Sequence, residues 1–344
     1  MWNRKLMSVT FAGLLAVTYI SSQARASDSI PRREARRILD ATGVKGGLIV
    51  HVGCADAQLT AALRANDSYL VHGLDTDAED IDRARKHIQS LGLYGKVSVD
   101  RFDGGRLPYI DNLANLIVAE DLGDVPMTEL MRVLAPKGVA YIRRGGKWTN
   151  TVKPWPDKID EWTHYLHDPQ GTGVGRDMVV GLPRRLQWVG GPKWLRNHDF
   201  MSSLNALVSS NGRIFYIIDE GLRNHIYMPA RWTVAARDAF NGTMLWKRRV
   251  DQWFPHLWPF KSGPGHLPRR IVAAGDRVYV TLGITAPLSV LDAATGETIR
   301  TYDQTKGTAE IVLADGVLFL VVDPDKQLLP YKHETPNRGK ERDR

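Results

Sequence analysis

The chain has 344 residues and a net charge of +8, and its single cysteine, Cys54, excludes a disulfide bond within it. Charges of both signs are mixed along the chain, and no basic stretch is interleaved with aromatic residues, so no specific nucleic-acid interface is expected. The densest basic cluster, residues 32–37, is expected to be a solvated helix face. The length leaves room for two domains behind a short targeting segment.

Residues 1–26 have the pattern of an export signal. The basic residues Arg4 and Lys5 precede an apolar run at 6–20, and residues 24–26 form an Ala-x-Ala cleavage pattern. Because the apolar run is short for a membrane span, we expect cleavage after Ala26 and no transmembrane segment in the mature protein. The expected location is the periplasm or cell envelope, and an uncleaved anchor is the alternative.

Residues 27–147 alternate between strand and helix patterns. The segment 47–53 is a continuous apolar run bounded by glycines, as expected for a buried parallel strand. Further strands are expected at 69–74, 96–99, 115–119 and 138–143, and helices at 29–42, 57–65, 77–91 and 127–134. This order predicts a Rossmann-like, doubly wound α/β sheet, which binds its ligand at the carboxyl ends of the central strands.

Gly53 and Asp75 lie at that edge of the predicted sheet. A glycine in the turn after the first strand lets the backbone approach a cofactor closely. An acid about 20 positions later can accept hydrogen bonds from ribose hydroxyls. The pair therefore predicts a nucleotide-type cofactor site.

Residues 44–145 resemble the class I S-adenosylmethionine-dependent methyltransferases. The segment 51–57 (HVGCADA) occupies the place of the family's glycine-rich loop, 73–75 matches its ribose-binding acid, and 102–103 matches the acid that faces the adenine amino group. The segment 131–138 resembles the family's passage from a helix into the fifth strand. The resemblance implies S-adenosylmethionine as cofactor, held by Gly53, Cys54, Ala55, Asp75, Asp103 and Glu120.

The chain also departs from that family. His51 stands where the family has an acid that helps to hold the methionine end, and Ala55 and Ala57 replace loop glycines. The chain passes into a linker rich in Trp and Pro at about Trp148, where the family's sixth and seventh strands would follow. These differences put a working methyl-transfer site in question, since a fold alone does not imply a function.

The catalytic residues remain unknown at this level. Glu120 and Asp121 lie where a base is usually found, and capping of their own loop is the alternative. Cys54 is either a reactive thiol or, as we expect, a small buried residue in a turn.

The expected linker, residues 148–185, carries a histidine pair with adjacent carboxylates. His164, His167 and Asp168 are weak candidates for a metal site if the segment is helical. Their spacing matches no specific zinc motif, so a hydrogen-bonded structural cluster is the expected arrangement.

From residue 186 to 323 the pattern changes to short strands with tight turns. Two kinds of hairpin alternate, and an Asp-Ala-x-x-Gly core recurs at 238–242 and 292–296. The hairpins are expected at 206–218, 235–246, 271–280, 289–300 and 311–320. Two hairpins in a repeat of about 40 residues are typical of a four-stranded propeller blade.

These repeats resemble the pyrroloquinoline-quinone-type propeller, in which a tryptophan closes each blade. Trp246 fits this pattern, and Arg300 replaces the tryptophan in the next repeat. About two and a half blades are expected, whereas closed propellers need roughly four to eight. The polar tail, residues 324–344, is expected to be disordered, and we expect either a truncated product of a longer gene or assembly with other blades.

Three functions follow from these features. The first is a methyltransferase whose propeller presents substrate. The second is a non-catalytic exported scaffold, whose propeller binds an envelope protein or polysaccharide; the combined architecture resembles large envelope proteins of planctomycete-type bacteria. The third is a fragment of a quinone-dependent dehydrogenase, which would need a complete propeller with convergent metal-binding carboxylates, so pyrroloquinoline quinone is not the expected cofactor.

Overall fold

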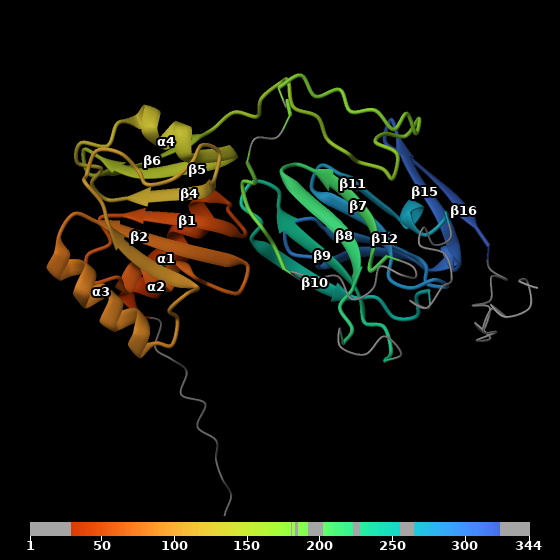
Figure 1. Cartoon of the computed structure of the whole chain (residues 1–344), viewed down its shortest axis with the longest axis horizontal. Helices are drawn as coiled ribbons and strands as arrows, with labels where there is room; N and C mark the ends of the chain where they lie inside the picture. Colours follow the sequence, from red (N-terminus) through yellow and green to blue (C-terminus); the bar gives the residue numbers. More distant parts are fainter. Residues whose placement is uncertain are drawn as a thin grey trace, which may run out of the picture.

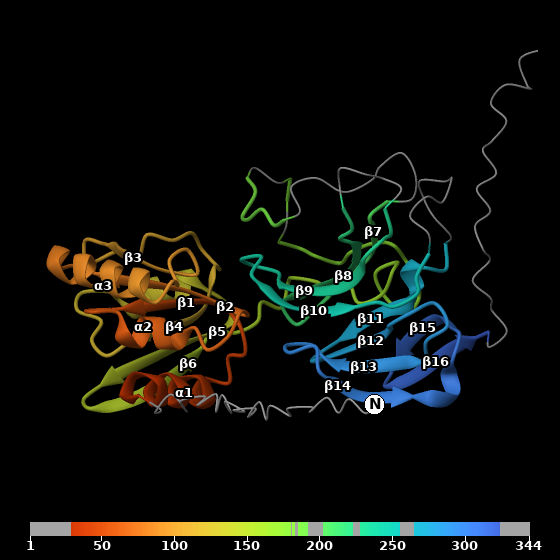
Figure 2. The same ribbon diagram turned by 90° about the horizontal axis from the view of Figure 1, so that it is seen from below.

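A computed structural model describes residues 29–179, 181–182, 185–191, 202–222, 228–254 and 265–323. They form an α/β domain and an all-β region that lie side by side (Figures 1 and 2). The expected export signal (1–26) and tail (324–344) lie outside the described residues, so these two predictions are untested. No helix in the described part of the chain is long and apolar enough to cross a membrane.

The α/β domain has one six-stranded sheet in the order β3-β2-β1-β4-β5-β6. Its strands are β1 (Gly47–Val52), β2 (Tyr69–Asp75), β3 (Val97–Arg101), β4 (Ala114–Ala119), β5 (Leu134–Arg144) and β6 (Lys147–Val152). The first five strands are parallel, as the alternation of strand and helix patterns predicted. The Rossmann-like fold expected for this half of the chain is confirmed.

Four helices cover the two faces of this sheet. They are α1 (Ile30–Thr42), α2 (Gln58–Leu63), α3 (Ala78–Ser90) and α4 (Met127–Val133). One apolar cluster joins α1, α2 and α3 to one face, and a second joins α4 to the other, with Ile49 and Val50 of β1 on opposite faces. Asp77 begins α3 because its carboxylate accepts the amides of Glu79 and Asp80.

The sixth strand corrects the boundary expected at residue 148. β6 pairs antiparallel with β5 across the turn Gly145–Gly146, and the Trp148 ring stacks on Tyr141 with centroids 4.7 Å apart. A strand therefore occupies part of the segment that was expected to be linker. It was missed because an exposed edge strand has no continuous apolar run, and Trp148 resembled the start of the Trp/Pro-rich segment.

The all-β region contains two four-stranded sheets and one hairpin. The first unit is β7 (Leu204–Ser210), β8 (Arg213–Asp219), β9 (Trp232–Asp238) and β10 (Met244–Arg249). The second unit is β11 (Ile271–Ala274), β12 (Arg277–Thr281), β13 (Leu288–Asp292) and β14 (Thr298–Tyr302), and the hairpin is β15 (Thr308–Ala314) with β16 (Val317–Val322). This arrangement is consistent with two and a half propeller blades, and the described residues form no closed ring.

A tryptophan docks each unit onto the preceding segment. The Trp246 indole donates to the Ala293 carbonyl at 2.9 Å, and its ring lies against Gly296, where an added Cβ would be 2.5 Å from the indole. Trp188 makes the same bond to Ala239, also at 2.9 Å. The docking of Trp246 agrees with the predicted repeat, whereas the equivalent role of Trp188 was not predicted.

The β9–β10 turn docks onto the amino-terminal edge of the α/β sheet. Asn115 of β4 donates to Asp238 at 2.7 Å, and its own side-chain oxygen accepts the amide of Leu48 at 2.8 Å and the Asn241 amide group at 2.7 Å. Ser68 donates to the Leu245 carbonyl at 2.5 Å. The all-β region therefore lies at the edge of the sheet opposite the carboxyl ends of its strands.

Candidate cofactor site

The loop 53–57 leaves β1 at the carboxyl edge of the sheet and is pinned to the end of β2. Asp75 accepts the amide of Ala55 with one oxygen, at 2.9 Å, and the amide of Asp77 with the other, at 3.1 Å. Gly53 and Cys54 both donate their amides to the Leu74 carbonyl, at 2.8 and 3.1 Å. Asp75 thus orients the loop, and the structure brings the predicted pair Gly53 and Asp75 together.

The loop keeps a glycine-type backbone although two of its glycines are replaced. Ala55 has φ +44° and Ala57 has φ +60°, beside Gly53 at +76°. This left-handed conformation costs roughly 1–2 kcal/mol for a residue with a Cβ. Ala55 is exposed, whereas Ala57 is fully buried at the start of α2, so the chain tolerates strain here instead of changing the path of the loop.

His51 does not supply the negative charge that the family's acid would bring. Its side chain is buried at the end of β1, with Nδ1 2.8 Å from the Thr60 hydroxyl. Burial lowers the pKa of His51 to about 4, against the opposing effect of Asp75. The imidazole is therefore neutral at physiological pH, and position 51 has become a packed, hydrogen-bonded part of the core.

Cys54 is a packing residue. Its side chain is 3% exposed, and an added Cβ on Gly73 would lie 2.8 Å from the Cys54 Cβ, so the turn after β1 is in close contact with β2 there. Burial, reinforced by the charge of Asp75, raises the pKa of the thiol to about 12. A thiol that stays protonated is a poor nucleophile, as expected for a small buried residue in a turn.

The other predicted acids line the same edge. Asp103 follows β3, is exposed, and accepts the amides of Gly105 and Arg106 at 3.0 and 3.1 Å. The Gly105 bond and then the Arg106 bond lower the pKa of this carboxyl. Glu120 follows β4 and lies 3.4 Å from Arg143.

Asp121 lies beside the first loop. Its carboxylate accepts the Gly123 amide at 3.0 Å, and its carbonyl lies 3.9 Å from where a Cβ on Gly53 would be. The β4 loop is thus next to the β1 loop, as the fold requires. The Gly123 bond matches the loop-capping role considered for this acid, whereas Glu120 is exposed and pairs with Arg143.

A polar chain near the site was not predicted. The Tyr109 hydroxyl lies 2.6 Å from Nδ1 of His72, and Nε2 of His72 lies 3.2 Å from Asp100. Burial, with help from the Asp100 charge, raises the pKa of Tyr109, and burial lowers the pKa of His72. No sequence motif links positions 72, 100 and 109, and only the packing of β2 against the loop after β3 brings them together.

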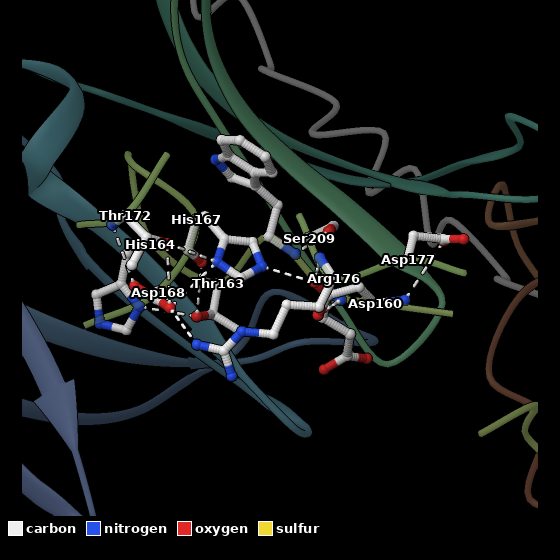
Figure 3. Close-up of polar contacts among 11 residues, drawn as sticks. Asp160, Thr163, His164, His167, Asp168, Thr172, Arg176, Asp177 and Ser209 are labelled. Atoms are coloured by element: carbon white, nitrogen blue, oxygen red, sulfur yellow. Dashed lines mark hydrogen bonds and ion pairs between the residues drawn. The ribbon is translucent and has the colours of Figure 1, made fainter. Parts of the chain in front are cut away.

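The weak metal candidates lie on the segment 160–176, which is bonded to strands of the all-β region (Figure 3). His167 faces Asp160 at 2.7 Å with one ring nitrogen and Asp168 at 3.2 Å with the other. His164 takes the amide of Leu313 on Nε2 at 3.1 Å, and its Nδ1 lies 2.8 Å from Thr163. No group of three metal ligands converges among the described residues, and both imidazoles serve a hydrogen-bond network.

The same segment holds the three β units together. Three consecutive residues, Trp162, Thr163 and His164, each accept a backbone amide from the first strand of a different unit. The donors are Ser209 of β7, Ala273 of β11 and Leu313 of β15, at 2.7, 3.0 and 3.1 Å. The three donor residues occupy the same repeat position, one residue before the last residue of each strand. The segment therefore links the three units through equivalent hydrogen bonds.

Comparisons with known proteins bear on the α/β domain. Residues 49–138 match the family model of the methyltransferase domain. Methyltransferase GfsG of Streptomyces halstedii is 32% identical over 99 residues, which are 27% of this chain and 36% of that protein. The chain therefore spans about a third of the length of this curated relative.

Two solved structures are similar to about a third of the chain. A SAM-dependent methyltransferase from Aquifex aeolicus is 23% identical, with a TM-score of 0.30, over 33% of this chain and 67% of that one. Geranyl diphosphate C-methyltransferase from Streptomyces coelicolor A3(2) is 17% identical, with a TM-score of 0.30, over 32% of this chain and 44% of that one. The family match lies within the α/β domain, which is similar there to the methyltransferase domain.

Proposed function

We propose that the α/β domain binds S-adenosylmethionine at its carboxyl edge and that the chain is a class I methyltransferase. The observation that carries the proposal is the carboxylate of Asp75, which is held by two amides at the end of β2 and fixes the loop 53–57. A carboxylate oxygen that accepts one amide can still accept a hydroxyl. The ribose-binding role implied by the family is therefore open to Asp75.

The described residues fit the two ends of the cofactor unequally. Asp75 and Asp103 are carboxylates on adjacent strand ends, placed for the ribose and the adenine amino group. The amides of the loop are mostly used internally, and His51 brings no charge to the methionine end. We therefore expect affinity to depend on the two acids and on backbone contact along Gly53 and Ala55.

The bound cofactor would supply an electrophilic methyl group. Glu120 is the acid we propose as proton acceptor, because its carboxylate is exposed directly after β4 and its 3.4 Å pairing with Arg143 leaves it accessible. The all-β region docks at the opposite edge of the sheet. A role in presenting substrate to this site is therefore not supported, and we propose that the region binds a partner instead.

Calorimetric titration of the full chain with S-adenosylmethionine tests the proposal. We expect binding that is lost in Asp75→Ala and retained in Asp82→Ala, which removes the same charge from an exposed position of α3. Asp75→Asn distinguishes the effect of the negative charge on binding from the effect of anchoring the loop, because the amide oxygen of asparagine can still accept the Ala55 amide. No binding by the folded wild-type chain would reject the cofactor proposal.

The second candidate is an exported, non-catalytic scaffold that binds an envelope protein or polysaccharide. The neutral His51 favours it, and β16 offers an edge strand with exposed apolar side chains, among them Phe319 at 57% exposure. Export itself is tested by fusing residues 1–30 to a reporter that is active only outside the cytoplasm. An inactive reporter would reject the export proposal and would not affect the methyltransferase proposal.

A further inference from the structure

The segment 160–176 holds the third β unit by a different kind of acceptor from the other two. The amides of Ser209 in β7 and Ala273 in β11 donate to backbone carbonyls of the segment, at 2.7 and 3.0 Å. The equivalent amide of Leu313 in β15 donates to Nε2 of the His164 side chain, at 3.1 Å. A carbonyl oxygen accepts at any pH, whereas an imidazole nitrogen accepts only while it carries no proton. Of these three bonds, the one to β15 therefore depends on a titratable group.

The contacts of His164 fix its protonation state. Its side chain is buried, and because Nε2 accepts the Leu313 amide, the proton of the neutral ring is on Nδ1. Nδ1 lies 2.8 Å from the Thr163 hydroxyl, which itself donates to the His167 carbonyl at 3.2 Å and so has a lone pair for the Nδ1 proton (Figure 3). A second proton, on Nε2, would point at the Leu313 N–H. The charged imidazole therefore cannot keep this bond.

The charged groups around His164 are paired with other side chains. The titratable and charged residues that line a cavity of about 240 Å³ together with His164 are Tyr165, Asp168, Arg269 and Glu310. Arg269 and Glu310 form an ion pair at 2.6 Å, and Asp168 pairs with Arg176 at 3.0 Å. Burial lowers the pKa of His164 below its ordinary value of 6.5, against the opposing charge of Asp168. The neutral ring is therefore the form that the folded chain favours.

The third unit depends on such contacts more than the first two. Its described residues form a two-stranded hairpin, β15–β16, and an isolated hairpin of this kind is only marginally stable. Ile311 packs the hairpin against Val272 and Leu288 of the second unit. We propose that His164 is a pH-sensitive attachment for the third β unit: a proton on Nε2 breaks the bond to Leu313 and loosens β15–β16, while β7 and β11 remain attached.

The direction of the pH effect follows from the lowered pKa of His164. The unfolded chain binds the proton more readily, so the stability that this bond supplies is complete above pH 6.5 and is lost as the pH falls through the lower folded-state value. We expect the loss to be local, because segments of a folded protein open separately, with free energies below that of global unfolding. Exchange of the backbone amides measures such opening.

Hydrogen–deuterium exchange of the full chain between pH 7.5 and 5, a range in which histidine titrates, tests the proposal. The rates are corrected for the intrinsic pH dependence of amide exchange, and the protection of residues 308–314 is compared with that of 204–210 and 271–274, which contain the equivalent amides. We expect the relative protection of 308–314 to fall by about fivefold towards pH 5, the factor that corresponds to one net hydrogen bond. Parallel changes in all three segments of the wild-type chain would reject the proposal.

His164→Gln distinguishes the effect of titration from the effect of packing. The amide oxygen of glutamine can accept the Leu313 amide and does not titrate, so the relative protection of 308–314 should stay constant with pH. His164→Ala removes the acceptor and should show low protection of 308–314 at every pH. The matched control, His87→Gln, removes an imidazole from α3 and should keep the wild-type profile. Retention of the pH dependence in His164→Gln would overturn the proposal, since another group would then control the attachment of the third unit.

Discussion

The side chain of Asn115 donates a hydrogen bond to Asp238 at 2.7 Å and so joins the fourth strand of the α/β sheet to the first β unit. Asp238 is the acid of the repeated Asp-Ala-x-x-Gly turn, and its other oxygen accepts the amides of Phe240 and Asn241. Burial raises the pKa of Asp238. The Asp-Ala-x-x-Gly turn, which in the second unit docks onto Trp246 of the first, thus in the first unit also docks the all-β region onto the α/β domain.

Asn115→Ala is expected to weaken this interface by about 2 kcal/mol, because the Leu48 amide and the Asp238 carboxylate lose buried partners. The free energy of unfolding in urea measures the loss. Asn150→Ala, which removes one bond to the Ala41 carbonyl at a partly exposed edge, should cost less than 1 kcal/mol. Equal losses in the two variants would contradict the role given to Asn115.

Ala55→Gly is expected to stabilise the chain by about 0.5–1 kcal/mol, because relief of the left-handed strain exceeds the entropy cost of a glycine. The same variant should bind S-adenosylmethionine more tightly, since a methyl group is removed from the closest approach. Ala57→Gly is the matched control. It relieves similar strain but loses a buried methyl worth about 0.8 kcal/mol, so its stability should change little.

The fold was largely predictable, because it depends on local patterns. The apolar run at β1 and the Asp-Ala-x-x-Gly turns at 238–242 and 292–296 each require a particular backbone whatever surrounds them. β6 was not predicted because an exposed strand paired on one side needs no apolar run. Its packing depends on the stacking of Trp148 on Tyr141, a contact that no sequence pattern indicates.

The site was predictable only in part. Asp75 follows from its spacing after Gly53, because that spacing reflects one βαβ unit. Asn115 and His164 carry no such signal, since their partners, Asp238 and the Leu313 amide, depend on how distant segments pack. A polar residue at a strand end has many potential partners in the sequence, and only the folded chain determines which of them it contacts.

Gly296→Ala is expected to destabilise the all-β region by about 2–4 kcal/mol. The new Cβ would lie 2.5 Å from the Trp246 indole, and the residue has φ +73°, so both packing and backbone oppose it. Gly275→Ala has φ +56° but meets nothing within 4 Å, and should cost only the backbone strain of about 1 kcal/mol. Thermal unfolding of the two variants measures the difference, and similar midpoints would show that the tryptophan dock is not rigid.

His51 makes stability depend on pH in a defined window. Its pKa is about 4 in the folded chain and 6.5 as a free group, so the unfolded chain binds the proton more readily between these values. The stability due to neutral His51 is complete above pH 6.5, is lost as the pH falls from 6.5 to 4, and changes no further below that. The loss should approach about 3 kcal/mol, since one pKa unit corresponds to roughly 1.4 kcal/mol.

Unfolding free energies of wild type and His51→Gln between pH 4 and 7.5 test this effect. Glutamine can keep a hydrogen bond to Thr60 but does not titrate, so the difference between the two proteins should shrink or reverse as the pH falls. His87→Gln on α3 should leave the wild-type pH profile in place. If the unfolding free energy of His51→Gln instead changes with pH as that of the wild type does, His51 is not the group responsible for the pH dependence. The conclusion that a neutral core residue replaces the family's acid then loses its main support.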